Sequence, residues 1–147
     1  MTAPVFVDSN VLVYHRDSSE KEKQAKAEVW LRALWSTRRG RVSFQVLHEY
    51  YVNVTAKLKP GLSSAEAQED IRNLMAWKPL PLDSSVLDTA FAVERRFGLS
   101  FWESLIVAAA QRAECIYLLS EDLQEGQNFD GVLVVNPFEQ EPDEVLS

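Results

Sequence analysis

The chain has 147 residues, of which 46% are hydrophobic and 25% are charged, proportions that suit one globular domain and exclude a wholly disordered chain. Because it has only 5 Gly and 6 Pro and no internal repeat, collagen-like and solenoid architectures are excluded too. The formal net charge of −7 argues against a general electrostatic affinity for nucleic acid or anionic lipid.

The apolar pattern predicts short strands separated by amphipathic helices. In chain order, the predicted elements are a strand over 4–7, a helix over 19–35, a strand over 42–44, helices over 46–58, 63–77, 83–97 and 100–113, and strands over 116–119 and 132–135. Ser63 and Glu66 have the spacing of a capping box, and residues 79–82 form an extended linker or edge strand. Short, continuous apolar strands between helices indicate an α/β fold with a parallel sheet covered on both faces.

Acidic residues follow two of the predicted strands. Val7 leads into Asp8, and Leu119 leads into Ser120, Glu121 and Asp122. Each acid alone is explained by helix capping. Together they lie at the carboxyl ends of neighbouring strands, where ligands bind in such sheets. Two like charges placed so close together need a proton or a cation to offset their repulsion.

Two further acids are candidates for the same site. Glu49 lies in an apolar-rich helix, where a solvated Glu is not the obvious choice, and Glu103 lies near a helix start, where it complements the helix dipole. Oxygen donors from four segments suit Mg²⁺ or Mn²⁺. One Cys and two His in the chain disfavour zinc. Phosphodiester hydrolysis is the chemistry that uses such a carboxylate cluster.

Four segments in this order resemble a PIN domain, and within that superfamily the VapC-type toxin ribonucleases of bacterial toxin–antitoxin pairs. They cover residues 6–12, 48–52, 99–106 and 118–123. The resemblance covers roughly residues 5–138, which predicts a single domain over 1–138 and leaves an acidic, flexible tail at 139–147. It implies a three-layer α/β/α fold with a mainly parallel central sheet.

The resemblance also implies a function. The chain is expected to be a Mg²⁺- or Mn²⁺-dependent endoribonuclease that forms a homodimer and is inhibited by a cognate antitoxin protein. The acidic residues that match the family's catalytic metal ligands are Asp8, Glu49, Glu103 and Asp122, with Ser9, Asn10 and Ser120 beside them. One position departs from the family pattern, because Glu103 stands where the third acid is usually Asp, and its extra methylene moves the carboxylate by about one C–C bond.

An RNA substrate must still approach an acidic protein. Residues 1–41 contain 8 Lys or Arg against 5 Asp or Glu, whereas 113–147 contain 9 Asp or Glu and no Lys or Arg, so a local basic surface is compatible with the acidic total. The candidate RNA contacts are Arg38, Arg39, Arg41, Lys57 and Lys59, with Arg95 and Arg96 as a further pair. Tyr50 and Trp102 are aromatic candidates for stacking on a base, although packing in the core is the favoured role for both.

Three alternatives were weighed against the nuclease. A haloacid-dehalogenase phosphatase needs a second Asp where Asn10 stands, and a response-regulator domain needs a Lys on a later strand, whereas no Lys follows Lys78. A PIN-like module that binds RNA or protein without cutting is the more serious alternative. The chain shows no signal-peptide pattern at its start and no apolar run near 20 residues, and its single Cys115 cannot form an internal disulfide, so a cytoplasmic protein without membrane contact is expected.

Overall fold

A computed structural model describes residues 3–146. The strands are β1 (Val5–Val7), β2 (Gly40–Arg41), β3 (Tyr117–Leu119), β4 (Asn128–Phe129) and β5 (Val132–Val135). The helices are α1 (Ser9–Arg16), α2 (Lys21–Thr37), α3 (Phe44–Val52), α4 (Ser64–Leu74), α5 (Ser84–Phe97), α6 (Phe101–Arg112) and α7 (Pro142–Leu146). A π-helical turn, η1 (Asn53–Lys57), follows α3, and a 3₁₀ turn, η2 (Met75–Trp77), follows α4.

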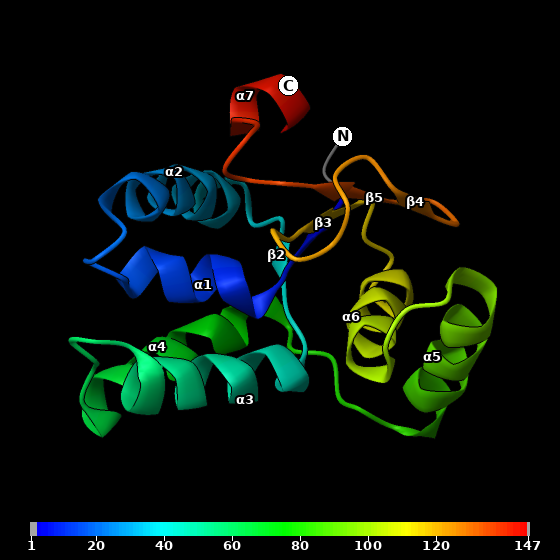
Figure 1. Cartoon of the computed structure of the whole chain (residues 1–147), viewed down its shortest axis with the longest axis horizontal. Helices are drawn as coiled ribbons and strands as arrows, with labels where there is room; N and C mark the ends of the chain where they lie inside the picture. The colour runs from blue at the N-terminus through cyan, green and yellow to red at the C-terminus, as the bar shows by residue number, and fades with distance from the viewer. Residues whose placement is uncertain (1–2, 147) are drawn as a thin grey trace.

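The five strands form one sheet in the order β2-β1-β3-β5-β4. All neighbours pair in parallel except β4 and β5, which form an antiparallel hairpin. Helices α1 to α4 lie together on one side of the molecule and the α5–α6 pair lies on the other, with the strands between and above them (Figure 1). The predicted α/β class with a mainly parallel central sheet is confirmed. No helix within residues 3–146 combines the length and apolar composition that a membrane span requires.

Burial of the apolar strand residues fixes the register of the sheet. Every residue of β1 is inaccessible to solvent, and Val7 is the partner of Leu119 in the parallel β1–β3 ladder. The chain therefore leaves both strands at the same edge of the sheet, with Asp8 after β1 and Ser120 after β3. Two backbone bonds extend the ladders at this edge, from Asp8 N to Leu119 O at 3.0 Å and from Ser120 N to Val135 O at 3.1 Å.

The local helix signals are confirmed. Ser63 and Glu66 form a capping box at α4, Asp83 caps α5, and Gly98 ends α5 with a φ of 69° that favours glycine. α5 and α6 pack as a helical hairpin around a small apolar cluster that includes Ala90 and Leu105.

The structure differs from the predicted elements at several points. The strand expected at 42–44 lies at Gly40–Arg41, because Ser43 accepts from Val46 N and begins α3. The helix expected over 46–58 changes to the π-helical turn at residue 53. β4 was not predicted, although Asp130 and Gly131, both at positive φ, form a dipeptide typical of hairpin turns. The tail expected to be flexible contains α7 beside α2, and Gln140 O accepts from Trp30 Nε1 at 2.8 Å.

Gly40 allows the edge strand β2 to pass against the buried Trp77. A Cβ at position 40 would lie 2.5 Å from Cε2 of Trp77, which itself packs on Trp35 with ring centroids 4.8 Å apart. We expect Gly40→Ala to lower the free energy of unfolding by about 1–3 kcal/mol, because the indole must move in a close-packed core. Urea unfolding of the single variants and of Gly40→Ala/Trp77→Phe checks this. The double variant should lose less than the sum of the two single losses, and strictly additive losses would contradict the clash.

Candidate active site

Two short loops at the carboxyl edge of the sheet supply the centre of the site. Asp8 ends β1 and caps α1, and its Oδ1 accepts from Ser9 N at 2.7 Å. Ser120 follows β3, is fully buried, and donates from Oγ to Asp8 Oδ2 at 2.8 Å. The same Ser120 oxygen accepts from the backbone N–H groups of Asp122, at 3.2 Å, and Leu123, at 3.4 Å. The two loops are therefore tied to each other through one serine hydroxyl.

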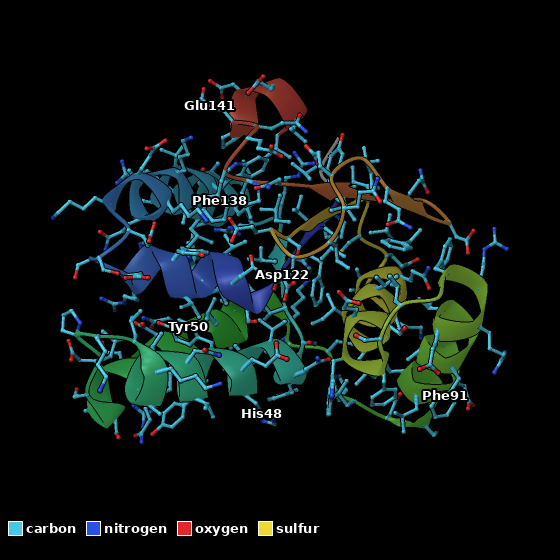
Figure 2. The ribbon with its side chains drawn as sticks, viewed as in Figure 1. His48, Tyr50, Phe91, Asp122, Phe138 and Glu141 are labelled. Carbon is cyan, nitrogen blue, oxygen red and sulfur yellow. The ribbon has the colours of Figure 1, made fainter. Side chains whose placement is uncertain are left out.

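Asn10 connects Asp8 with the loop that follows β3. Its Nδ2 lies 3.2 Å from Asp8 Oδ2 and 3.3 Å from Asp122 Oδ2, so one amide group donates toward both carboxylates. Its Oδ1 accepts from Glu121 N at 3.2 Å, which fixes the orientation of the amide. Asn10 therefore sets the position of Asp122, an exposed side chain that lies beyond the start of α1, facing the space between α1 and α6 (Figure 2).

Glu49 reaches the same group from α3. Ser9 Oγ donates to Glu49 Oε1 at 2.9 Å, and Gln45 Nε2 donates to Glu49 Oε2 at 3.3 Å. Glu49 is half-buried, as its apolar surroundings in the sequence indicated. Three of the predicted acids, Asp8, Glu49 and Asp122, are thus joined through the hydroxyl and amide groups of the predicted neighbours Ser9, Asn10 and Ser120.

Glu103 has a different partner in the structure. It occupies the third position of α6, where its N–H donates to Ser100 Oγ at 3.1 Å and its Oε1 accepts from Ser100 N at 3.2 Å. The two residues form a capping box, which is the structural role that a first-turn acid predicts. α6 still reaches the site, because Gln45 Nε2 also donates to Trp102 O at 3.4 Å.

Gln45 was not predicted. It lies one helical turn before Glu49 and is only 5% exposed. Its amide nitrogen faces two acceptors, Glu49 Oε2 and Trp102 O, while its Oε1 has no hydrogen-bond partner within residues 3–146. The only sequence signal was a polar residue at the i−4 position of a candidate ligand in an apolar helix.

The predicted basic contacts are not gathered at this edge. Arg38 and Arg39 precede β2, and Arg39 O accepts from Val5 N, so both lie where the parallel strands begin, opposite to Asp8. Arg39 is buried and donates from Nε to Ala3 O at 2.9 Å, so its prediction as an exposed RNA contact is wrong. Arg41 donates to Arg38 O and Gly40 O in the same region.

The other basic candidates remain exposed. Lys57 and Lys59 are exposed beyond the end of α3, as are Arg95 and Arg96 near the end of α5, where Arg96 forms an ion pair with Asp130 at 2.9 Å.

Burial controls the electrostatics of the centre. Desolvation raises the pKa of Asp8 from 3.8 to about 6, hydrogen bonds from Ser120 and Ser9 lower it, and the negative charges of Glu49 and Asp122 raise it further. Within residues 3–146, no three His, Cys, Asp or Glu side chains are grouped closely enough to hold a metal ion as they stand. The donors nonetheless fit Mg²⁺ or Mn²⁺, because they are carboxylate oxygens around a buried acid whose charge needs compensation.

The raised pKa of Asp8 predicts a measurable effect on stability. Between pH 3.8 and about 6 the folded protein holds a proton on Asp8 that the unfolded chain releases, so the stability contributed at low pH is lost as pH rises through this window. We therefore expect Asp8→Asn, at pH 7.5 in EDTA, to increase the free energy of unfolding by about 1–3 kcal/mol. This gain should disappear near pH 4.

Urea unfolding from pH 4 to 8 measures both effects. Asp88→Asn, which removes one carboxylate from the exposed face of α5, is the matched control and should change stability less. A loss of stability in Asp8→Asn at pH 7.5 would show that the hydrogen bonds of the carboxylate outweigh its desolvation.

Comparison with known proteins identifies the fold and the family. Three solved structures share the fold. A toxin–antitoxin complex from Klebsiella pneumoniae is 18% identical, with a TM-score of 0.63 over 90% of this chain and 97% of that chain. FitAB bound to an IR36 DNA fragment is 21% identical, with a TM-score of 0.71 over 93% of this chain and 97% of that chain, and VapC20 of Mycobacterium tuberculosis, described as a Sarcin-Ricin loop cleaving toxin, is 17% identical, with a TM-score of 0.59 over 80% and 91%. No curated protein matches the chain. The family model of the PIN domain matches residues 5–125, a span that contains every acidic and polar residue of the candidate site. The chain therefore belongs to the PIN domain family.

Proposed function

We propose that this protein is a metal-dependent endoribonuclease, the toxin of a type II toxin–antitoxin pair, that hydrolyses RNA phosphodiester bonds. The observation that carries the proposal is the junction of Asp8, Glu49 and Asp122 through Ser9 and Asn10 at the carboxyl edge of the sheet. PIN-domain membership and the toxin structures that share the fold support it. A cognate antitoxin, a homodimer and a cytoplasmic location belong to the same proposal.

Mg²⁺ or Mn²⁺ would be held by Asp8, Glu49 and Asp122, where it supplies an activated water and stabilises the oxygen that leaves phosphorus. The protein's own part is to place these oxygens. Ser120 holds Asp8, Ser9 holds Glu49, and Asn10 holds Asp122. Because every donor to a carboxylate here is a neutral hydroxyl or amide, the negative charge needed for a cation is kept.

The reaction expected from this arrangement is direct hydrolysis. Water attacks phosphorus, the 3′-oxygen leaves and takes a proton, and the products are a 5′-phosphate and a 3′-hydroxyl. No attack by the 2′-oxygen is required, and within the described residues no histidine lies among the hydrogen bonds that join the three acids. His48, adjacent to Glu49 in sequence, is exposed and points away from the site on the outer side of α3 (Figure 2).

Cleavage of end-labelled RNA tests the proposal. Purified full-length protein, free of antitoxin, is incubated with structured and unstructured RNAs in Mn²⁺, Mg²⁺ or EDTA. We expect metal-dependent cleavage that falls by at least about 100-fold in Asp8→Asn and by roughly 10- to 100-fold in Asn10→Ala, because each change disturbs the oxygen set or its supports. Asp88→Asn is the control with unchanged activity. Undiminished cleavage in EDTA, or a 2′,3′-cyclic phosphate product, would overturn the mechanism.

Glu103 favours a second candidate function, a PIN-like module that binds RNA or protein without cutting. Its carboxylate caps α6 through Ser100 and is one methylene longer than the usual Asp. In the nuclease proposal Glu103 takes part as a fourth carboxylate that acts through water. The retained charges at Asp8, Glu49 and Asp122 favour the nuclease, because a binding module gains nothing from the repulsion among them.

Glu103→Gln distinguishes these roles, because the amide oxygen of Gln accepts the same bond from Ser100 N. We expect its cleavage rate to fall by roughly 10- to 100-fold while its melting temperature stays at that of the wild type. Glu103→Asp is the companion variant and should cleave at least as fast as the wild type. An unchanged rate in Glu103→Gln would leave Glu103 as a helix cap only, and no cleavage by any variant would favour the binding module.

A further inference from the structure

The first turn of α6, whose backbone contacts Gln45 at the candidate site, presents an unusually exposed aromatic side chain. Trp102 is 64% exposed, more than any other large hydrophobic side chain in residues 3–146, whereas Tyr50, the other aromatic candidate, is 3% exposed and donates its hydroxyl to Asp70. The core role expected for Trp102 from the sequence is therefore wrong. Exposing so large an apolar surface to water is unfavourable, because the hydrophobic effect favours its burial.

Trp102 is fixed to the acidic site through its backbone. The buried Gln45 amide donates to Trp102 O and to Glu49 Oε2 from the same nitrogen. These two acceptors fix the orientation of the Gln45 amide, since a reversed amide would place its oxygen against Trp102 O and Glu49 Oε2. The first turn of α6 is consequently held beside the Glu49 carboxylate, and α6 lies next to the beginning of α3 (Figure 1).

The ring of Trp102 is supported by neighbouring aromatic residues. Phe101 packs edge-on against it, with ring centroids 5.3 Å apart, and Phe101 in turn lies 6.1 Å from Phe91 on α5. Phe91 projects from the outer part of the α5–α6 hairpin (Figure 2). Aromatic packing of this kind restricts the rotation of an exposed ring, and 64% of Trp102 stays accessible to a ligand.

Charge indicates which ligand suits this face. Lys23, which reaches the loop after β3, is already paired with Glu121, next to Asp122. Arg38 and Arg39 lie at the opposite edge of the sheet. A nucleobase is neutral and flat, so it can approach an aromatic ring beside three carboxylates without the repulsion that a phosphate meets there.

We propose that Trp102 is a base-stacking residue that holds an unpaired nucleobase of the RNA beside the Asp8–Glu49–Asp122 site. This inference rests on the proposed ribonuclease function and gives that site a substrate class, RNA with an unpaired base next to the cleaved bond. Stacking on an aromatic ring is tolerant of base identity, so Trp102 selects for single-strandedness rather than for a sequence.

Binding of RNA to full-length variants tests the proposal. The probes are a fluorescein-labelled 12-nucleotide RNA without secondary structure and the same strand in a duplex, both measured by anisotropy in EDTA. We expect Trp102→Leu to weaken binding of the single strand by roughly 5- to 100-fold, the range for loss of one stacked base, and Trp102→Phe to keep most of the affinity. The dependence of affinity on salt should stay that of the wild type, because no phosphate contact is lost.

Trp35→Leu is the matched control, because Trp35 is 41% exposed on α2, away from the acids. It should bind RNA as the wild type does, and melting temperatures should show that every variant is folded. Equal affinities for Trp102→Leu and the wild type would overturn the proposal. The proposal would also be overturned if Trp102→Phe bound the single strand as weakly as Trp102→Leu does. A change of oligomeric state in Trp102→Leu, measured by light scattering, would overturn it too, because the ring would then be a contact between protein chains.

Cleavage by the wild type, measured in parallel, separates this inference from the proposed function. If the wild type cleaves RNA and Trp102→Leu binds RNA as tightly as the wild type, the nuclease proposal stands and the stacking proposal is overturned. Trp102-dependent binding without cleavage in Mn²⁺ would support the stacking residue and overturn the nuclease. A wild type that neither binds nor cleaves RNA would overturn both.

Discussion

Parallel pairing of β1 with β3 brings the two acidic loops together, and the candidate site depends on it. Val7 and Leu119 are partners in the ladder, so Asp8 and Ser120 leave their strands side by side and form a buried 2.8 Å hydrogen bond. A slip of one residue would turn the buried side chains of β1 toward the opposite face and separate this pair. The apolar contacts that stabilise the sheet therefore also determine where the carboxylates meet.

The same pairing creates an electrostatic conflict. Asp8 loses most of its hydration at the end of a fully buried strand, and burial raises its pKa to about 6 despite the hydrogen bonds from Ser120 and Ser9. Glu49 and Asp122 add repulsion rather than relief. A fold selected for stability alone has no use for such an arrangement, whereas a site that binds a divalent cation needs concentrated negative charge before the ion arrives. The local instability and the proposed chemistry thus have one origin.

Much of the site was predictable because the signal was local. A polar segment directly after an apolar strand identifies the carboxyl edge of a parallel sheet, which was enough for Asp8 and Asp122. Ser63 and Gly98 likewise carry their cap geometry in the adjacent residues. The shift of β2 to residues 40–41 was less predictable, because Ser43 can end a strand or begin a helix and only its bond to Val46 N decides.

Tertiary contacts account for what the sequence could not indicate. Gln45 resembles any polar residue of an amphipathic helix until α6 is packed beside α3 and supplies Trp102 O as a second acceptor. Arg39 belongs to a basic run that suggests a surface, yet the parallel order of β2 and β1 buries it against Ala3 O. In both cases the decisive partner is distant in sequence, so neither periodicity nor charge pattern could reveal it.

The distribution of charge bears on how an acidic protein selects RNA. If phosphate contacts supplied most of the affinity, any RNA would bind and the affinity would depend steeply on salt. Here Lys23 is already in an ion pair with Glu121, next to Asp122, and the proposal leaves a neutral ring and a cation as the attractive elements at the carboxyl edge. Such a surface discriminates by whether a base is free to leave its helix, since a paired base cannot stack on Trp102 without first being unpaired. Under this proposal a net negative charge favours selectivity, because the acids would repel duplex RNA, whose paired bases are not free to stack.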